Sequence, residues 1–102
     1  RILLNKEIIA INQDALGEAA HRVDFPSACR VYLRNLSGNR QAIAIMNPSD
    51  TPQRVQLPLS ILGNAKEYNF RDVWEHKTTR QRKAWQGTLQ PHETKVFTVT
   101  IR

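Results

Sequence analysis

The first segment of the chain carries apolar side chains at the spacing of a helix. Leu4, Ile8 and Ile11 follow the i, i+4, i+7 pattern of one helical face. Asn5 is a suitable N-cap, and Gly17 ends the pattern. The remaining apolar positions surround this face: Ile2, Leu3, Ile9 and Ala10. A helix that is apolar almost all round needs burial on several sides, so we expect it to pack against a neighbour outside this chain.

After Gly17 the hydrophobic period changes to two, which indicates β-strands. Alternation and β-branched side chains predict strands over residues 21–25, 29–33, 40–46, 55–57, 66–74, 84–89 and 94–101. Turn residues separate these strands, and the connection 58–63 has room for one helical turn. About seven short strands with turns every roughly 8–12 residues are typical of an all-β sandwich or barrel.

Two of the predicted strands carry further expectations. Residues 40–46 are apolar on both faces, so this strand should be central and covered on both sides. Trp74 continues the face that holds Tyr68 and Phe70, which predicts that Trp74 fills the core. For Trp85 two roles stay open: it could fill the core as well, or its indole could serve as a stacking platform for a sugar ring.

The composition changes this picture little. The chain has 102 residues, 40% of them hydrophobic and 24% charged, which suits one globular domain. No apolar stretch approaches the roughly 18 residues of a membrane-spanning helix. The single cysteine, Cys29, cannot form an internal disulfide and lies on the expected inward face of a strand, as a small buried hydrophobe would.

The net charge of +6 raises the question of a polyanionic partner. The one basic run contains Arg80, Arg82 and Lys83. On a strand the two arginines would share a face and could contact phosphates. The run also suits a solvated edge strand, where positive charge discourages sheet-to-sheet association, and we favour this interpretation. We therefore expect no nucleic-acid partner, and no membrane partner either.

Candidate catalytic and metal-binding residues are few. Asp72 and Glu75 could form an acid–base pair, but a strand-end aspartate more often ties down a turn. His21, His76 and His92 lack metal-ligand spacing, and no nucleophile or phosphate-loop motif occurs. We therefore expect no catalytic, substrate-binding or metal-binding residue and no cofactor. The triplet Asn35–Ser37 fits a glycosylation sequon, which matters only in a eukaryotic secretory setting.

Several stretches together resemble glycoside hydrolase family 27, the α-galactosidase or melibiase family. Residues 3–17, L-L-N-K-E-I-I-A-I-N-Q-D-A-L-G, are similar to the phrase that ends the family's catalytic barrel. Residues 68–74, Y-N-F-R-D-V-W, resemble a strand of its C-terminal domain. Residues 36–47 and Pro91-His92 resemble its hairpin and the turn before its final strand.

The resemblance implies a fold and a domain division. Residues 1–17 would be the terminal helix of a (β/α)8 barrel that lies outside this chain. Residues 18–102 would form an antiparallel Greek-key β-sandwich of seven or eight strands. The chain would thus be a piece of a longer enzyme.

The resemblance also implies a catalytic function for the parent enzyme, but it places no catalytic residue in this chain. Family members are retaining exo-glycosidases that remove terminal α-galactose or a close relative, with a nucleophilic aspartate in a Lys-x-Asp motif, and no such triplet occurs here. The chain would be a non-catalytic accessory domain that stabilises the barrel through residues 2–11 and a face of the sandwich. The parent would be secreted, periplasmic or lysosomal. A sugar-binding module with Trp85 as platform is the alternative, followed by a small nucleic-acid-binding domain.

Overall fold

The computed structural model describes residues 11, 20–23 and 27–101. The helix expected within residues 1–17 therefore lies outside the described residues except for Ile11, and so do positions 24 and 25 of the first expected strand. The described residues contain eight strands: β1 (His21–Val23), β2 (Arg30–Leu36), β3 (Arg40–Met46), β4 (Gln53–Pro58), β5 (Tyr68–Asp72), β6 (Lys77–Gln81), β7 (Ala84–Leu89) and β8 (Thr94–Ile101). A 3-10 helix, η2 (Leu59–Leu62), provides the helical turn expected between β4 and β5.

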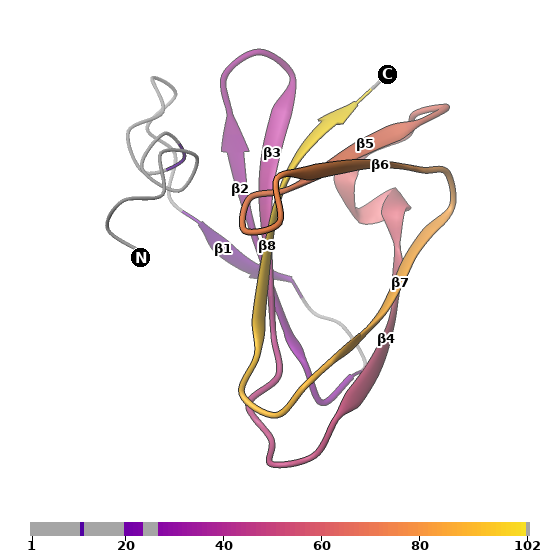
Figure 1. Ribbon diagram of the computed structural model, residues 1–102. Coiled ribbons are helices and arrows are strands. Elements are labelled where there is room, and N and C mark those ends of the chain that lie inside the picture. Colours follow the sequence, from indigo (N-terminus) through magenta and orange to yellow (C-terminus); the bar gives the residue numbers. More distant parts are fainter. Residues whose placement is uncertain (1–10, 12–19, 24–26, 102) are drawn as a thin grey trace.

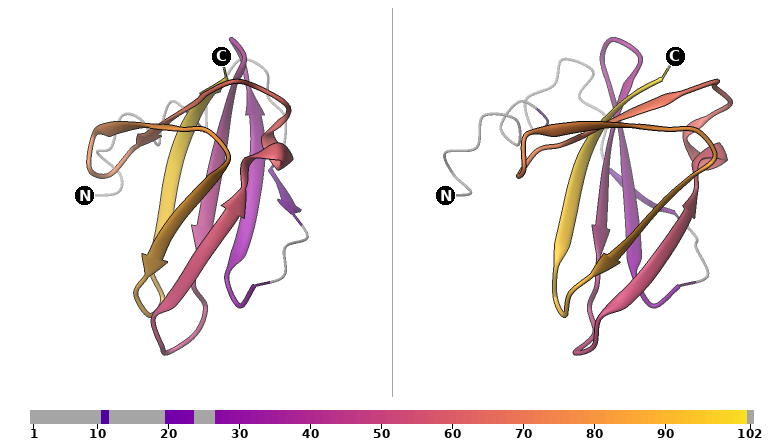
Figure 2. Two further views of the ribbon diagram at one scale, coloured as in Figure 1. Left: turned by 90° about the vertical axis from the view of Figure 1, so that its right-hand side faces the viewer. Right: turned by 45° about the vertical axis from the view of Figure 1, so that its right-hand side comes forward.

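The strands form two antiparallel sheets that face each other (Figure 1). The larger sheet has the order β1-β2-β3-β8-β5-β6, and the smaller sheet consists of β4 and β7. The last strand, β8, pairs with β3 on one side and β5 on the other, so it joins two hairpins that are distant in the sequence. Figure 2 shows β4 and β7 crossing in front of the larger sheet. The prediction of an all-β antiparallel sandwich is confirmed.

The core lies between the two sheets because alternate residues of each strand point inward. Ile43 and Ile45 of β3 are fully buried, as are Val55 and Leu57 of β4 on the opposite sheet. β3 is central, as expected, since β2 and β8 flank it. The other face of β3 is less completely covered: Ala42 on this face is buried, but Ala44 is only half-buried. The larger sheet therefore has one closed face and one partly open face.

A buried asparagine ties together the loops at one end of the sandwich. Asn47 is fully buried, and its Nδ2 group donates to the carbonyl oxygens of Thr51, Leu89 and Gln90 at 2.8, 3.2 and 3.1 Å. Its Oδ1 atom accepts from the backbone N–H and the hydroxyl of Ser49. Folding takes these loop groups away from water, and the hydrogen bonds of Asn47 replace those that the water had provided.

The region of residues 66–83 differs most from the predicted strands. The predicted strand 66–74 is shorter, because β5 ends at Asp72 and the chain turns back into β6. β6 lies at the edge of the larger sheet, and four of its five residues are exposed. The described residues contain no helix with both the length and the hydrophobicity needed for a membrane span.

Candidate functional site

Asp72 holds the turn that connects β5 to β6. Its Oδ1 atom accepts hydrogen bonds from the backbone N–H groups of Trp74 and Glu75, at 2.9 and 3.0 Å. The backbone N–H of His76 donates to the carbonyl of Asp72 at 2.8 Å, and Arg71 donates to the carbonyl of His76 at 2.7 Å. The interpretation of Asp72 as a turn residue is therefore confirmed. Glu75 belongs to the same turn and is exposed.

The prediction that Trp74 fills the core is wrong, and of the two roles considered for Trp85 the structure shows the core position. Trp74 is 39% exposed, because the chain has already left the sheet when it reaches this position. Trp85 is only 7% exposed and packs against Phe97, with ring centroids 5.5 Å apart. It points inward from β7, so it offers no open ring face as a stacking platform.

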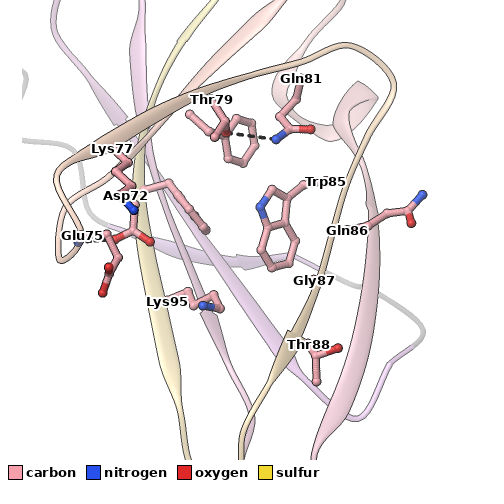
Figure 3. Close-up of a pocket in the computed structure, with 12 residues that line it drawn as sticks. Asp72, Glu75, Lys77, Thr79, Gln81, Trp85, Gln86, Gly87, Thr88 and Lys95 are labelled. Atoms are coloured by element: carbon pink, nitrogen blue, oxygen red, sulfur yellow. Dashed lines mark hydrogen bonds between the residues drawn. The ribbon is translucent and has the colours of Figure 1, made fainter.

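A cleft of about 430 Å³ lies between β7 and the β5–β6 side of the larger sheet (Figure 3). We call it the inter-sheet cleft. Its apolar wall consists of Phe70, Trp85 and Phe97, which come from three different strands. Phe70 and Phe97 are in contact, with centroids 5.3 Å apart, so the three rings form one continuous aromatic group. Volumes of about 300–1,000 Å³ are usual for small-molecule sites.

Polar side chains surround this aromatic wall. Their charges balance, because Asp72 and Glu75 face the cleft together with Lys77 and Lys95. Lys95 is held in place by Glu93, with Nζ 3.3 Å from Oε2. The neutral polar groups at the cleft include Thr79, Gln81 and Gln86. Gln81 donates through Nε2 to the hydroxyl of Thr79 at 3.0 Å, which fixes its orientation (Figure 3).

The cysteine and the histidines form no site with one another. Cys29 is buried, and its backbone N–H donates to the hydroxyl of Ser27. Burial raises the pKa of the Cys29 thiol, and a side-chain hydrogen bond between the thiol and Ser27 opposes this shift. His92 is exposed in its turn and pairs with Asp50, with Nε2 2.6 Å from Oδ1. Within the described residues, no three His, Cys, Asp or Glu side chains gather as metal ligands.

The residues of the basic run and of the sequon-like triplet lie in or next to strands. Arg80 ends near the edge of β6 and lies 3.7 Å from the Glu67 carboxylate. Arg82 lies in the bend between β6 and β7, so it does not share a strand face with Arg80. This agrees with an edge strand rather than a phosphate-binding stripe. Asn35 of the triplet is half-buried within β2.

The outer face of the larger sheet, which points away from β4 and β7, is rich in arginine. The strand register places five arginines on it: Arg22, Arg30, Arg34, Arg40 and Arg71. Between them lies an apolar hollow of about 160 Å³, where Tyr32, Ala44 and Val96 meet Ile11. The Nε atom of Arg34 is buried and has no hydrogen-bond partner among the described residues. Such a group is costly to bury, and no residue that the structure describes on this face supplies an acceptor for Arg34.

Sequence reasoning identified Asp72 and Trp85 but missed the inter-sheet cleft. Thr79, Gln81 and Lys95 carry no motif, and only the pairing of β5 with both β6 and β8 brings them together. The alternation within each strand indicated which residues point inward, but it could not indicate which strand ends leave an opening.

Comparison with known proteins shows the same fold in one family. A family model described as the alpha galactosidase C-terminal beta sandwich domain matches residues 27–99. Alpha-galactosidase 2 of Arabidopsis thaliana is 33% identical to this chain over 104 residues, which cover 99% of the chain and 26% of the plant protein. An alpha-galactosidase of Coffea arabica is 30% identical, with 98% of the chain and 27% of the relative covered.

Solved structures give the same result. A Bacteroides fragilis protein described as an alpha-galactosidase/melibiase is 35% identical, with a TM-score of 0.82, and the match covers 95% of this chain and 21% of that one. Alpha-galactosidase I of Mortierella vinacea has a TM-score of 0.87 at 20% identity, over 96% of this chain and 27% of that one, which supports the fold alone. The chain spans about a quarter of the length of the curated relatives it matches.

Proposed function

Because the chain belongs to the family of alpha galactosidase C-terminal beta sandwich domains, we propose that it is the non-catalytic accessory domain of a retaining glycoside hydrolase. In this proposal the parent enzyme removes terminal α-galactosides in a (β/α)8 barrel, and the sandwich packs against that barrel and stabilises it. The parent would be secreted, periplasmic or lysosomal.

One observation carries this proposal. The relatives match nearly the whole of this chain, yet the match takes up only about a quarter of each relative. Those relatives are named as alpha-galactosidases. Three quarters of their length is therefore available for a catalytic domain, while this chain supplies a sandwich whose strand-end aspartate, Asp72, is engaged in a turn.

We place the contact with the barrel on residues 2–11 and on the outer face of the larger sheet. Two features of this face support the assignment. Its hollow is lined by Ile11, the last residue of the segment 2–11 and the one residue of that segment that the structure describes. No residue in the described ranges accepts from the Arg34 Nε atom, and a carboxylate or carbonyl of the barrel would provide an acceptor. The arginines would then match an acidic barrel surface.

The catalytic part of the proposal is tested by activity. The 102-residue chain alone should not hydrolyse an aryl α-galactoside, whereas the longer protein that carries it should. Hydrolysis by the isolated chain, with a rate that survives further purification, would overturn the non-catalytic assignment.

The stabilising role needs a second measurement on the longer protein. Replacing Arg34→Met should lower its melting temperature by a few degrees, because a barrel acceptor would lose its charged partner. Arg54→Met is the matched control, since Arg54 is exposed on β4, away from the outer face. Equal melting temperatures for the two variants would contradict docking through this face.

A further inference from the structure

The indole nitrogen of Trp85 points into the inter-sheet cleft. Figure 3 shows it turned from β7 toward the side of the cleft that holds Asp72 and Lys77. Trp85 is only 7% exposed, yet its Nε1–H has no hydrogen-bond partner among the described residues. Among the described residues, Arg34 Nε is the one side-chain nitrogen or oxygen that is fully buried without a hydrogen-bond partner. The Trp85 nitrogen is therefore still open to solvent. A buried indole usually finds an acceptor for this group.

The position of Trp85 is fixed rather than adaptable. A Cβ atom at Gly87 would come within 2.6 Å of the indole ring, so only glycine lets the ring lie against the backbone of β7. Phe97 contacts the ring as well. The donor is therefore held in place before any ligand arrives, which reduces the entropy lost on binding.

The surrounding groups select the class of ligand. Two carboxylates and two ammonium groups balance, so the cleft has no net attraction for an anion or a cation. Donors and acceptors surround an aromatic wall, and the amide of Gln81 can act as both. A sugar ring matches this arrangement, because each hydroxyl both donates and accepts and the ring carbons present apolar C–H groups.

We propose that the inter-sheet cleft binds a neutral pyranose sugar, with the Trp85 indole N–H donating to a ring or hydroxyl oxygen. The sugar lies against the edges of the aromatic wall rather than stacked on an open indole face. Lys95 and Gln81 bind its hydroxyl groups from the larger sheet. This proposal rests on the residues of the cleft alone, so it does not depend on the function proposed above.

The test uses the 102-residue chain with nitrogen-15 label and a panel of neutral monosaccharides: galactose, glucose, mannose and xylose. The indole N–H resonance of Trp85 should shift in a saturable manner with at least one of them, while that of exposed Trp74 stays in place. No saturable shift at Trp85 with any of these sugars would overturn the proposal. A stronger response to glucuronate or sulfate than to every neutral sugar would overturn the assignment as well.

Variants then separate binding from folding. Trp85→Phe keeps an aromatic ring in the core but removes the donor, so saturation transfer to the sugar should show about threefold to tenfold weaker binding. Trp74→Phe is its matched control and should bind as the parent chain does. Lys95→Met should also weaken binding, unlike Lys66→Met at an exposed lysine outside the cleft. Unchanged binding in both cleft variants, with folding verified by amide spectra, would contradict the proposal.

Discussion

At the scale of single residues, the pair Trp85 and Gly87 shows how a small side chain determines the place of a large one. Both residues point inward from β7, two positions apart. A Cβ atom at Gly87 would lie 2.6 and 2.8 Å from two atoms of the indole. The ring could relieve such a clash only by moving toward Phe97, which already contacts it. The absence of a side chain at Gly87 therefore matters to both the core and the cleft.

We expect Gly87→Ala to lower the free energy of unfolding by about 1–3 kcal/mol, because the added methyl group overpacks the core. Urea unfolding measures this change, and Trp85 fluorescence should shift with it. Thr88→Ala, at the exposed neighbouring position, should cost less than about 1 kcal/mol. If Gly87→Ala were as stable as the parent chain, the close contact with Trp85 would not constrain the core.

The Cys29 thiol makes stability depend on alkaline pH. Burial raises its pKa above the ordinary value of 9.0, so the folded chain retains the thiol proton longer than the unfolded chain. Below the unfolded pKa both states are protonated and the contribution is fully present. As the pH rises through 9 and beyond, the unfolded state loses its proton first and stability falls. Cys29→Ala should therefore show a shallower alkaline decline, and parallel declines in the two chains would contradict this.

At the scale of elements, the turn between β5 and β6 depends on one carboxylate. Asp72→Ala removes both side-chain hydrogen bonds to the turn backbone, so we expect a loss of about 1–2 kcal/mol in the free energy of unfolding. Glu75→Ala is the matched control, because no hydrogen bond of its side chain holds the turn among the described residues. Thermal and urea unfolding would compare them. Equal losses would mean that the turn is stabilised by backbone geometry instead.

The elements that could be predicted are those whose alternation is continuous. Residues 40–46 and 84–89 match β3 and β7, because the apolar side chains that each strand contributes to the core, such as Ile43 and Ile45, lie an even number of positions apart. β6 has no such signal, since its residues lie at the sheet edge where neither face is well covered. Trp74 was misplaced for a related reason: the pattern continues in the sequence after Asp72 has already ended the strand.

The cleft could not be predicted at this scale. Its walls come from β5, β6, β7 and β8, and no two of its polar groups form a recognisable sequence motif. A cleft depends on how two sheets diverge, which follows from twist and strand number rather than from any one strand. The buried tryptophan was visible in the sequence, but the direction of its N–H group was not.

At the scale of the whole molecule, stability is concentrated in the middle of the larger sheet. β3 and β8 are paired on both sides and contribute buried residues such as Ile43 and Val99. β6 is paired on one side only and is mostly exposed. Hydrogen-bonded amides of β3 and β8 should therefore exchange at least about a hundredfold more slowly than those of β6. Hydrogen exchange followed by NMR checks this, and uniform protection across the sheet would contradict it.

The place of β8 has a consequence for synthesis on the ribosome. Until residues 94–101 leave the exit tunnel, the hairpins β2–β3 and β5–β6 have no strand between them and cannot form one sheet. Nascent chains shorter than this therefore expose Ile43, Ile45 and Phe70 to chaperones and proteases. A premature stop codon within the last strand would thus lead to degradation of the domain rather than to a slightly shortened one.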